Sequence, residues 1–492
     1  MNNKIKQIVK HPLLYILILG LVIRLYYLVK TYSQTAWWDE CVYMIMASTW
    51  SGGPEYAFTA ARPILFSFII YLFNFVTTSI LVPRLIVLFF SMAAVLGMYY
   101  LGKSSTGQTR IGLLAALLTS VFYLHIFYSQ RILMDTISFT FFIWAAYFFV
   151  EYFKENKPKL LYVATVITAV GFLFRITTAF ILGVVFIYLL LMEGFKMFKR
   201  KELWIAIVLF GLVIAPYIVW GFIQFDGFVL TKAFETNAPS TGSFLGNGLQ
   251  LFIQYTARGY MLIPNTLGLL WLIFLVIGLI SFYKLFVCFD LRKKDKNIRQ
   301  MLFVLLLFII PLAANCFLLN HVEDRYIFNV FPAIILLICI ANFKIMDYIE
   351  DHEGRGMAVF MFIASLILLL MSQFMVIGPI IGASIGSYGP VKEAGLWMKT
   401  TSSPGDVIVT SSYPQIQYYS QRLAQPIPPT KGEYETMDRT NHKYFIVSVF
   451  EKSPEWSYSY PTEKNLTIAN MYLDNDKNPL LIVYNLKGEP ME

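Results

Sequence analysis

The sequence predicts a polytopic α-helical membrane protein with a small extracytoplasmic α/β domain at its C-terminal end. Two observations lead to this fold class. First, 57% of the 492 residues are hydrophobic and only 14% are charged, whereas soluble proteins have about 25% charged residues. Second, long apolar runs fill most of the chain up to residue 385, while residues 386–492 change to short segments typical of strands and small helices.

The formal net charge of +9 indicates either a nucleic-acid partner or a membrane topology signal. Cytoplasmic loops of membrane proteins collect Lys and Arg. Most cationic residues of this chain lie in clusters between apolar runs, which is the pattern of such loops. We therefore expect a lipid bilayer around the protein and no nucleic-acid partner.

A bilayer-spanning helix requires about 20 mostly apolar residues. The candidate runs are 12–29, 61–77, 82–101, 111–128, 136–153, 160–174, 176–193, 203–222, 263–283, 300–319, 326–343 and 357–381. All clusters of Lys and Arg fall on one side of the membrane only if 61–77 does not span. We therefore expect about eleven spans, with 61–77 as a juxtamembrane helix at the outer interface.

This counting predicts a cytoplasmic N-terminus and an extracytoplasmic tail of a multi-pass cell-membrane protein. The transmembrane domain covers residues 1–385, with a first outer loop at 30–81 and a long outer loop at 223–262. The extracytoplasmic domain covers 386–492. Within it we expect a short helix at 392–399 and strands at 406–410, 444–449 and 480–484.

The same topology places several ionisable side chains together on the outer face. The acidic ones are Asp39, Glu40 and Asp135, and the basic ones are Arg62, Arg84, Arg131, Arg175 and Arg325. Charges at membrane depth are costly and mark functional sites. Arginines pair with phosphate through two hydrogen bonds, and a carboxylate can remove a proton from a hydroxyl. A lipid-borne phosphate fits this set, but a proton relay or an ion path would use the same residue types.

Four short motifs on this face resemble a known class of enzymes. The string YSQRILMD at 128–135 resembles a segment of protein O-mannosyltransferases that enters a helix. Asp39-Glu40-x-x-Tyr43 resembles the first-loop acidic motif of the wider GT-C glycosyltransferase class, which also includes the aminoarabinose transferase of lipid A. Val82-Pro-Arg84-Leu resembles the start of a span in these enzymes. Glu323-Asp-Arg325-Tyr326 resembles the Arg-Tyr step before a late span.

The resemblance implies an enzyme that moves one sugar from a polyprenyl-phosphate donor to a hydroxyl of a protein, lipid or glycan, with inversion. Asp39 then matches the catalytic base, Glu40 holds the acceptor or tunes Asp39, and Asp135 orients groups or supports a metal. The residues expected to bind the donor phosphate or substrate are Arg62, Arg84, Arg131, Arg175, Arg325, Tyr326 and Tyr43. No cofactor is required, and a divalent metal stays open, with Asp39, Asp135, His321 and Glu323 as its candidate ligands.

Two other classes of function are alternatives to this one. A transporter or flippase for lipid-linked sugars predicts internally repeated halves with broken helices, and the sequence has no such repeat. A non-catalytic membrane assembly factor with a degenerate site is the other alternative. The motif set favours the glycosyltransferase.

Overall fold

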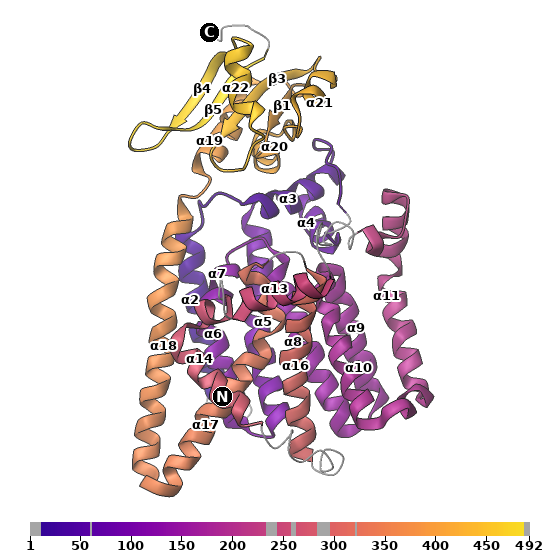
Figure 1. Ribbon diagram of the computed structural model, residues 1–492, viewed down its shortest axis with the longest axis vertical. Coiled ribbons are helices and arrows are strands. Elements are labelled where there is room, and N and C mark those ends of the chain that lie inside the picture. Colours follow the sequence, from indigo (N-terminus) through magenta and orange to yellow (C-terminus); the bar gives the residue numbers. More distant parts are fainter. Residues whose placement is uncertain are drawn as a thin grey trace. The chain divides into compact units, whose positions relative to one another are not determined.

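The computed structural model describes residues 11–59, 62–232, 244–256, 262–282, 296–319 and 322–486. The chain divides into two compact units (Figure 1). The helical unit consists of Met1–Val29, Thr59–Leu65 and Arg84–Ile380, and the α/β unit consists of Lys30–Phe58, Phe66–Pro83 and Ile381–Glu492. Most of the first outer loop therefore groups with the C-terminal part of the chain.

The helical unit is built from long apolar helices joined by short turns. Its elements are α2 (Pro12–Lys30), α5 (Leu81–Thr106), α6 (Thr109–Val121), α7 (Tyr123–Tyr128), α8 (Met134–Glu155), α9 (Pro158–Phe174), η1 (Ile176–Ala179), α10 (Phe180–Glu193), η2 (Gly194–Lys199), α11 (Lys201–Phe225), α13 (Phe244–Thr256), α14 (Leu262–Ile280), α16 (Lys296–Leu318), η4 (Asp324–Asn329), α17 (Phe331–Glu353) and α18 (Arg355–Ile385). The long outer loop expected at 223–262 contains α13 in its described part.

Eight helices among the described residues are long and apolar enough to cross a membrane, and four more apolar helices are shorter. One of the shorter helices is α4 (Leu65–Asn74), whose 10 residues cover only about 15 Å. This length agrees with the expectation that 61–77 does not span. The count of eleven spans stays a prediction, and the multi-pass character is confirmed.

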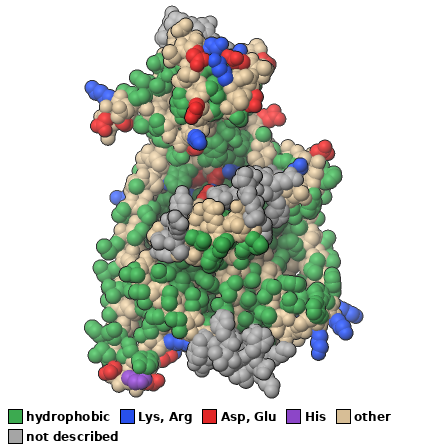
Figure 2. Space-filling view, in the orientation of Figure 1, with side chains coloured by type: hydrophobic (Ala, Val, Ile, Leu, Met, Phe, Trp, Pro, Cys, Tyr) green, Lys and Arg blue, Asp and Glu red, His purple; other side chains and the backbone are tan. Residues whose placement is uncertain are grey.

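The surface of the helical unit is apolar and its interior holds polar groups, as expected in lipid. Hydrophobic side chains cover the face shown in Figure 2, and on α11 Ile207 is 61% exposed. Inside, the Arg24 guanidinium of α2 donates to Ser91 Oγ at 2.6 Å and to the Ser120 carbonyl at 2.9 Å, and lies 3.0 Å from His125 Nδ1. These bonds join α2 to α5, α6 and α7, since a buried cation requires hydrogen-bond partners.

The run 111–128, expected as one span, is broken at Phe122. This residue has an extended conformation (φ −61°, ψ 117°), so α6 ends at Val121 and α7 is a separate short helix. The break turns the chain before Arg131 and Asp135. It therefore positions the start of α8, where the candidate site lies.

The α/β unit contains a five-stranded sheet in the order β2-β1-β3-β5-β4. The strands are β1 (Val407–Thr410), β2 (Leu423–Gln425), β3 (His442–Ser448), β4 (Thr467–Leu473) and β5 (Pro479–Asn485). β1 pairs in parallel with β2 and β3, and β5 is antiparallel to both β3 and β4. The three strands expected from the sequence are confirmed, while β2 and β4 were not predicted.

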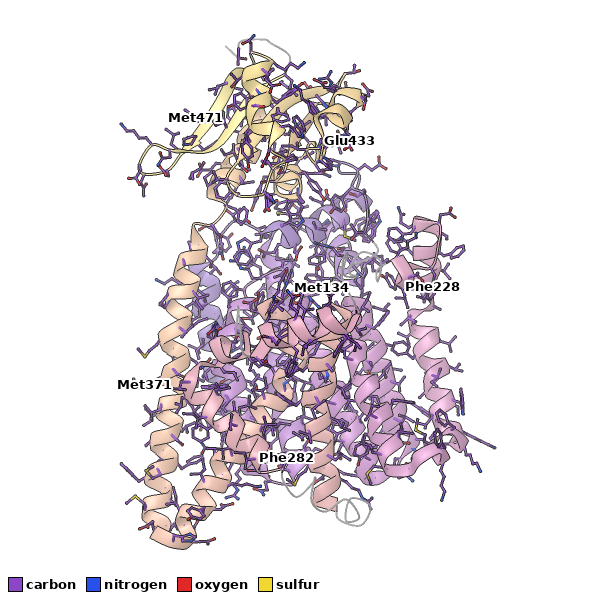
Figure 3. The ribbon with its side chains drawn as sticks, viewed as in Figure 1. Met134, Phe228, Phe282, Met371, Glu433 and Met471 are labelled. Carbon is purple, nitrogen blue, oxygen red and sulfur yellow. The ribbon has the colours of Figure 1, made fainter. Side chains whose placement is uncertain are left out.

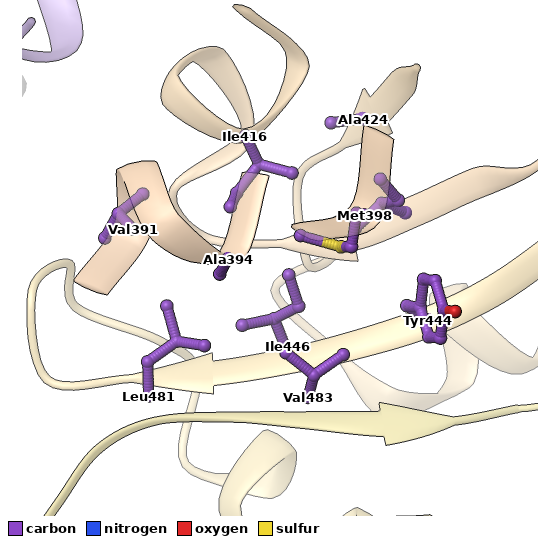
Figure 4. Close-up of a cluster of buried hydrophobic side chains, with 10 residues drawn as sticks. Val391, Ala394, Met398, Ile416, Ala424, Tyr444, Ile446, Leu481 and Val483 are labelled. Atoms are coloured by element: carbon purple, nitrogen blue, oxygen red, sulfur yellow. The ribbon is translucent and has the colours of Figure 1, made fainter. Parts of the chain in front are cut away.

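Helices cover both faces of this sheet because its central strands alternate large apolar residues on both sides. On one face, α19 (Gly389–Thr401) and α20 (Tyr413–Ser420) pack Met398 and Ile416 against Ile446 (Figure 4). Ile408 belongs to the same cluster. On the other face, α21 (Lys431–Thr436) and α22 (Trp456–Glu463) supply the core that surrounds Phe445. The short helix expected at 392–399 is confirmed as part of α19.

The first-loop segment of the α/β unit is α3 (Trp38–Trp50), which packs on α20. The Ala36 N–H donates to Tyr419 Oη at 2.8 Å, and Trp37 Nε1 donates to Ser387 Oγ at 2.9 Å. The Trp38 and Tyr413 rings meet edge to face at 4.9 Å. These contacts fix the start of α3, which carries Asp39 and Glu40.

Candidate active site

Asp135 lies in the first turn of α8 and is 2% exposed. A carboxylate is favourable at a helix N-terminus, where the main-chain N–H groups point outward. Its oxygen Oδ1 forms an ion pair with the Arg175 guanidinium. In Figure 3, Met134, the residue before Asp135, lies toward one end of the helical unit and Phe282 toward the other.

Arg175 follows α9 directly and has an extended backbone (φ −153°, ψ 125°). This conformation ends α9 and separates it from the 3-10 turn η1. The guanidinium lies 5.2 Å from the centre of the Tyr326 ring, within the range of a cation–π contact. Arg175 therefore joins the start of α8 to the turn that precedes α17.

That turn, η4, supplies the second arginine of the site. Arg325 forms an ion pair with Glu323 and lies 5.8 Å from the centre of the Tyr326 ring. The neighbouring Asp324 accepts a hydrogen bond of 2.6 Å from Tyr128 Oη. Burial raises the pKa of Asp324, while the Tyr128 hydrogen bond opposes that shift. The turn is thus held to α7 and stays close to α8.

Asp135, Arg175, Arg325 and Tyr326 line a common small cavity of about 10 Å³. The other lining residues are Ser138, Thr177, Asn315, Phe328 and Asn329. Asn315 Nδ2 donates to the Tyr326 carbonyl at 2.8 Å, and Asn329 Nδ2 donates to the Thr177 carbonyl at 3.3 Å. The space is about that of one water, so a phosphate would enter only if the surrounding side chains moved.

The remaining candidate arginines of the helical unit are not among the residues that line this cavity. Arg131 is 1% exposed and stacks on the Phe127 ring at 5.3 Å. Arg84 is 1% exposed in the first turns of α5, and Arg62 is half-buried in the segment before α4. The structure brings Asp135, Arg175, Arg325 and Tyr326 together.

Asp39, Glu40 and Tyr43 belong to the other unit, on α3. The Glu40 side chain is fully buried, and its Oε2 accepts a 2.8 Å hydrogen bond from the Trp37 N–H. This bond satisfies a main-chain donor at the start of the helix, as a capping carboxylate does. Tyr43 is buried with its ring 5.7 Å from that of Phe66. Glu40 and Tyr43 thus hold α3, and Asp39, the residue before Glu40, is half-buried.

A second carboxyl group near Asp39 comes from the distant residue Glu451, which the sequence reasoning missed. Glu451 follows β3 and accepts a 3.1 Å hydrogen bond from Tyr388 Oη. Burial raises the pKa of Glu451, and the negative charge of Asp39 raises it further. The only sequence signal is an acidic residue just after a strand, which is common on protein surfaces.

Three comparisons relate this chain to known proteins. Residues 61–220 match the family described as dolichyl-phosphate-mannose-protein mannosyltransferase. No match was found among curated proteins. The structure of ArnT from Cupriavidus metallidurans bound to undecaprenyl phosphate is similar with a TM-score of 0.65 and 10% identity, over 96% of this chain and 97% of that one.

The oligosaccharyltransferase of Archaeoglobus fulgidus is similar as well. Its structure with a tethered acceptor peptide has a TM-score of 0.63 and 11% identity, over 96% of this chain and 74% of that one. Its complex with an inhibitory peptide and a dolichol-phosphate has a TM-score of 0.60 and 12% identity, over 98% of this chain and 75% of that one. This chain therefore shares the fold of these two proteins, a membrane fold of the GT-C type.

The expected fold class is therefore confirmed. The matched residues 61–220 run from α4 into α11 and include Asp135 and Arg175. The divalent-metal site that the sequence left open gains no support from the way candidate ligands cluster. Among the described residues, no group of three His, Cys, Asp or Glu side chains is arranged to hold a metal. Glu323 pairs with Arg325, Asp39 lies in the other unit, and His321 lies outside the described residues.

Proposed function

We propose that this protein is a membrane glycosyltransferase that moves a single sugar from a polyprenyl-phosphate donor to a hydroxyl of a protein, lipid or glycan. The observation that carries the proposal is the cavity in which Asp135, Arg175, Arg325 and Tyr326 meet. The match of residues 61–220 to a dolichyl-phosphate-mannose family supports the donor class. The similar folds of proteins bound to undecaprenyl phosphate and dolichol-phosphate support it further.

The arginine pair suits the charge that the reaction releases. As the bond between the anomeric carbon and the phosphate oxygen breaks, negative charge grows on the phosphate. Guanidinium groups held in advance stabilise that charge without reorganising. Arg175 and Arg325 each bind a carboxylate, and the planar fork of N–H donors on a guanidinium suits it to hold a phosphate through two parallel hydrogen bonds.

Asp39 is the proposed general base. It would take the proton of the acceptor hydroxyl while the hydroxyl oxygen attacks the anomeric carbon, opposite the leaving phosphate, which inverts the configuration. Glu40 would act through the main chain at the start of α3, and Asp135 would hold Arg175. On this reading the domain at residues 386–492 is extracytoplasmic and the N-terminus is cytoplasmic.

Purified protein should be incubated with radiolabelled polyprenyl-phosphate sugars of several kinds and with hydroxyl-bearing peptides, glycans and lipids. We expect release of polyprenyl phosphate and label in one acceptor class, with the rates of both about 10²–10⁴-fold lower in Asp39→Asn. A folded protein that binds a donor but transfers label to no acceptor, in parent and variant alike, would favour the assembly-factor alternative. Movement of intact donor across vesicle membranes without hydrolysis would favour the flippase.

A further inference from the structure

A second cavity lies in the helical unit, between α8, α10 and α16. Its volume is about 190 Å³, larger than the roughly 150 Å³ cavity that admits benzene in an engineered protein. It is lined by Lys154, which is in the last turn of α8. Asp135 is in the first turn of the same helix, so about 28 Å separates the two sites at 1.5 Å per residue.

One wall of this cavity is aromatic. Phe153 of α8 lies 4.3 Å from the Tyr188 ring of α10 and 5.6 Å from the Phe303 ring of α16, measured between ring centres. Tyr188 and Phe303 are 5.7 Å apart. Each of the three helices therefore supplies one ring, and the wall is a packed feature of the fold.

The other wall is polar and basic. Arg299 and Gln300 begin the described side chains of α16, and both line the cavity with Lys154. Gln300 Nε2 donates to the Ser104 carbonyl at 3.3 Å, and Lys154 Nζ donates to Ser104 Oγ at 3.2 Å and to Glu151 at 2.7 Å. The lining includes two cationic side chains and, among the described residues, no carboxylate.

We propose that this cavity binds the phosphate headgroup of an anionic membrane phospholipid, at the opposite end of α8 from the candidate active site. A cation and an amide beside an aromatic wall fit a phosphate joined to an acyl-glycerol. Basic pockets between membrane helices bind such headgroups. The apolar outer surface of α10, where Phe186 is 45% exposed, offers a path for the acyl chains.

The test uses full-length protein in detergent with phosphatidylglycerol, phosphatidylcholine or inorganic phosphate added separately. Native mass spectrometry counts bound lipid, and thermal melting reports stabilisation. We expect retention of phosphatidylglycerol over phosphatidylcholine. Arg299→Gln should weaken phosphatidylglycerol binding about fivefold, from the roughly 1 kcal/mol that one cation contributes near an anionic lipid. Gln300→Glu should weaken it comparably, because it places a carboxylate in the cavity.

The matched control is Arg355→Gln, at an exposed arginine that starts α18. It should leave lipid retention unchanged, and Arg299→Lys should restore most of it. Equal retention of phosphatidylglycerol by the parent, Arg299→Gln and Gln300→Glu would overturn the proposal. Saturable stabilisation by inorganic phosphate that matches that of phosphatidylglycerol would overturn it too, because the cavity would then be a site for free phosphate.

Discussion

The carboxylates that lie beside the arginines of the helical unit differ from those around the start of α3. In the helical unit Asp135 forms an ion pair with Arg175, and Glu323 forms one with Arg325. In the α/β unit Glu40 binds a main-chain N–H. There Glu451 is bound by Tyr388, within the electrostatic reach of Asp39.

This difference in partners suits the two groups of carboxylates to different roles, the positioning of an arginine and the transfer of a proton. A carboxylate in an ion pair with arginine is suited to position that arginine, because its charge is already balanced. In the α/β unit, burial raises the pKa of Glu451 and the negative charge of Asp39 raises it further, so a carboxyl group that holds its proton more tightly lies within the electrostatic reach of the proposed base. This comparison supports a phosphate-binding role for the helical unit and a proton-transfer role for α3.

The largest expected effect is on turnover. Asp39→Asn keeps the shape of the side chain and removes its basicity, so we expect turnover to fall about 10²–10⁴-fold with donor binding intact. Single-turnover transfer at saturating donor measures this. Glu55→Gln, at an exposed carboxylate of the same segment, is the control. A near-normal rate in Asp39→Asn, with a large loss in Asp135→Asn, would make Asp135 the base.

The next effect is on stability. Arg175→Ala leaves the Asp135 charge buried without its partner, and breaking a buried pair costs about 3–5 kcal/mol. Arg175 is 20% exposed on its side chain, so we expect the lower end of that range. The control is Arg110→Ala, which breaks the exposed Arg110–Asp347 pair at 2.9 Å and should cost about 0.2–1 kcal/mol.

Thermal melting in detergent compares the two variants. Equal losses from Arg175→Ala and Arg110→Ala would mean that Asp135 is not buried as an ion. The double variant Asp135→Asn with Arg175→Ala removes both charges, so it should recover part of the loss. Failure to recover would assign the loss to packing.

A smaller effect is expected on donor binding. Arg325→Ala removes a charge-assisted hydrogen bond to the donor phosphate, worth about 1.5–3 kcal/mol. The dissociation constant for a polyprenyl-phosphate sugar should therefore rise about 10–150-fold, with little change in melting temperature. Arg355→Ala is the exposed control. If donor affinity is the same in both variants, Arg325 serves the η4 turn and not the phosphate.

Much of the helical architecture could be predicted because apolar length and Lys/Arg clustering act over short stretches of sequence. The ends of α8 and α9 were expected where Asp135 and Arg175 interrupt apolar runs, since charges are excluded from the middle of a span. The break at Phe122 was not expected. Phe122 is itself apolar, and the run 111–128 contains no proline and no Asp, Glu, Lys or Arg, so hydropathy carries no sign of the break.

Partner choice could not be predicted, because it depends on tertiary contacts. Nothing in the sequence indicates that Asp135 pairs with Arg175 and not with Arg131, which lies closer along the chain. Arg131 instead stacks on Phe127. Glu451 approaches Asp39 only through the fold of the α/β unit, and β4 was missed because its residues alternate weakly and are largely exposed.

The smallest effect concerns the pH dependence that Glu451 gives to the α/β unit. Because its pKa is raised in the folded state, the folded protein holds this proton more tightly than the unfolded chain. Its contribution to stability is present below the ordinary pKa of 4.5 and is lost as the pH rises through the raised value.

Glu451→Gln stays neutral and can still accept the Tyr388 hydrogen bond, so the stability of this variant should lack the pH dependence that Glu451 gives to the parent. For a half-buried group screened by solvent, we expect a difference from the parent below about 1 kcal/mol at pH 8 and none near pH 4. Thermal melting of the parent, Glu451→Gln and the exposed control Glu455→Gln across this range measures it, and Asp39→Asn should remove part of the parent's pH dependence. Parallel melting curves for the parent and Glu451→Gln at every pH would show that Glu451 and Asp39 are not coupled, and the proposed contrast between the two units would fail.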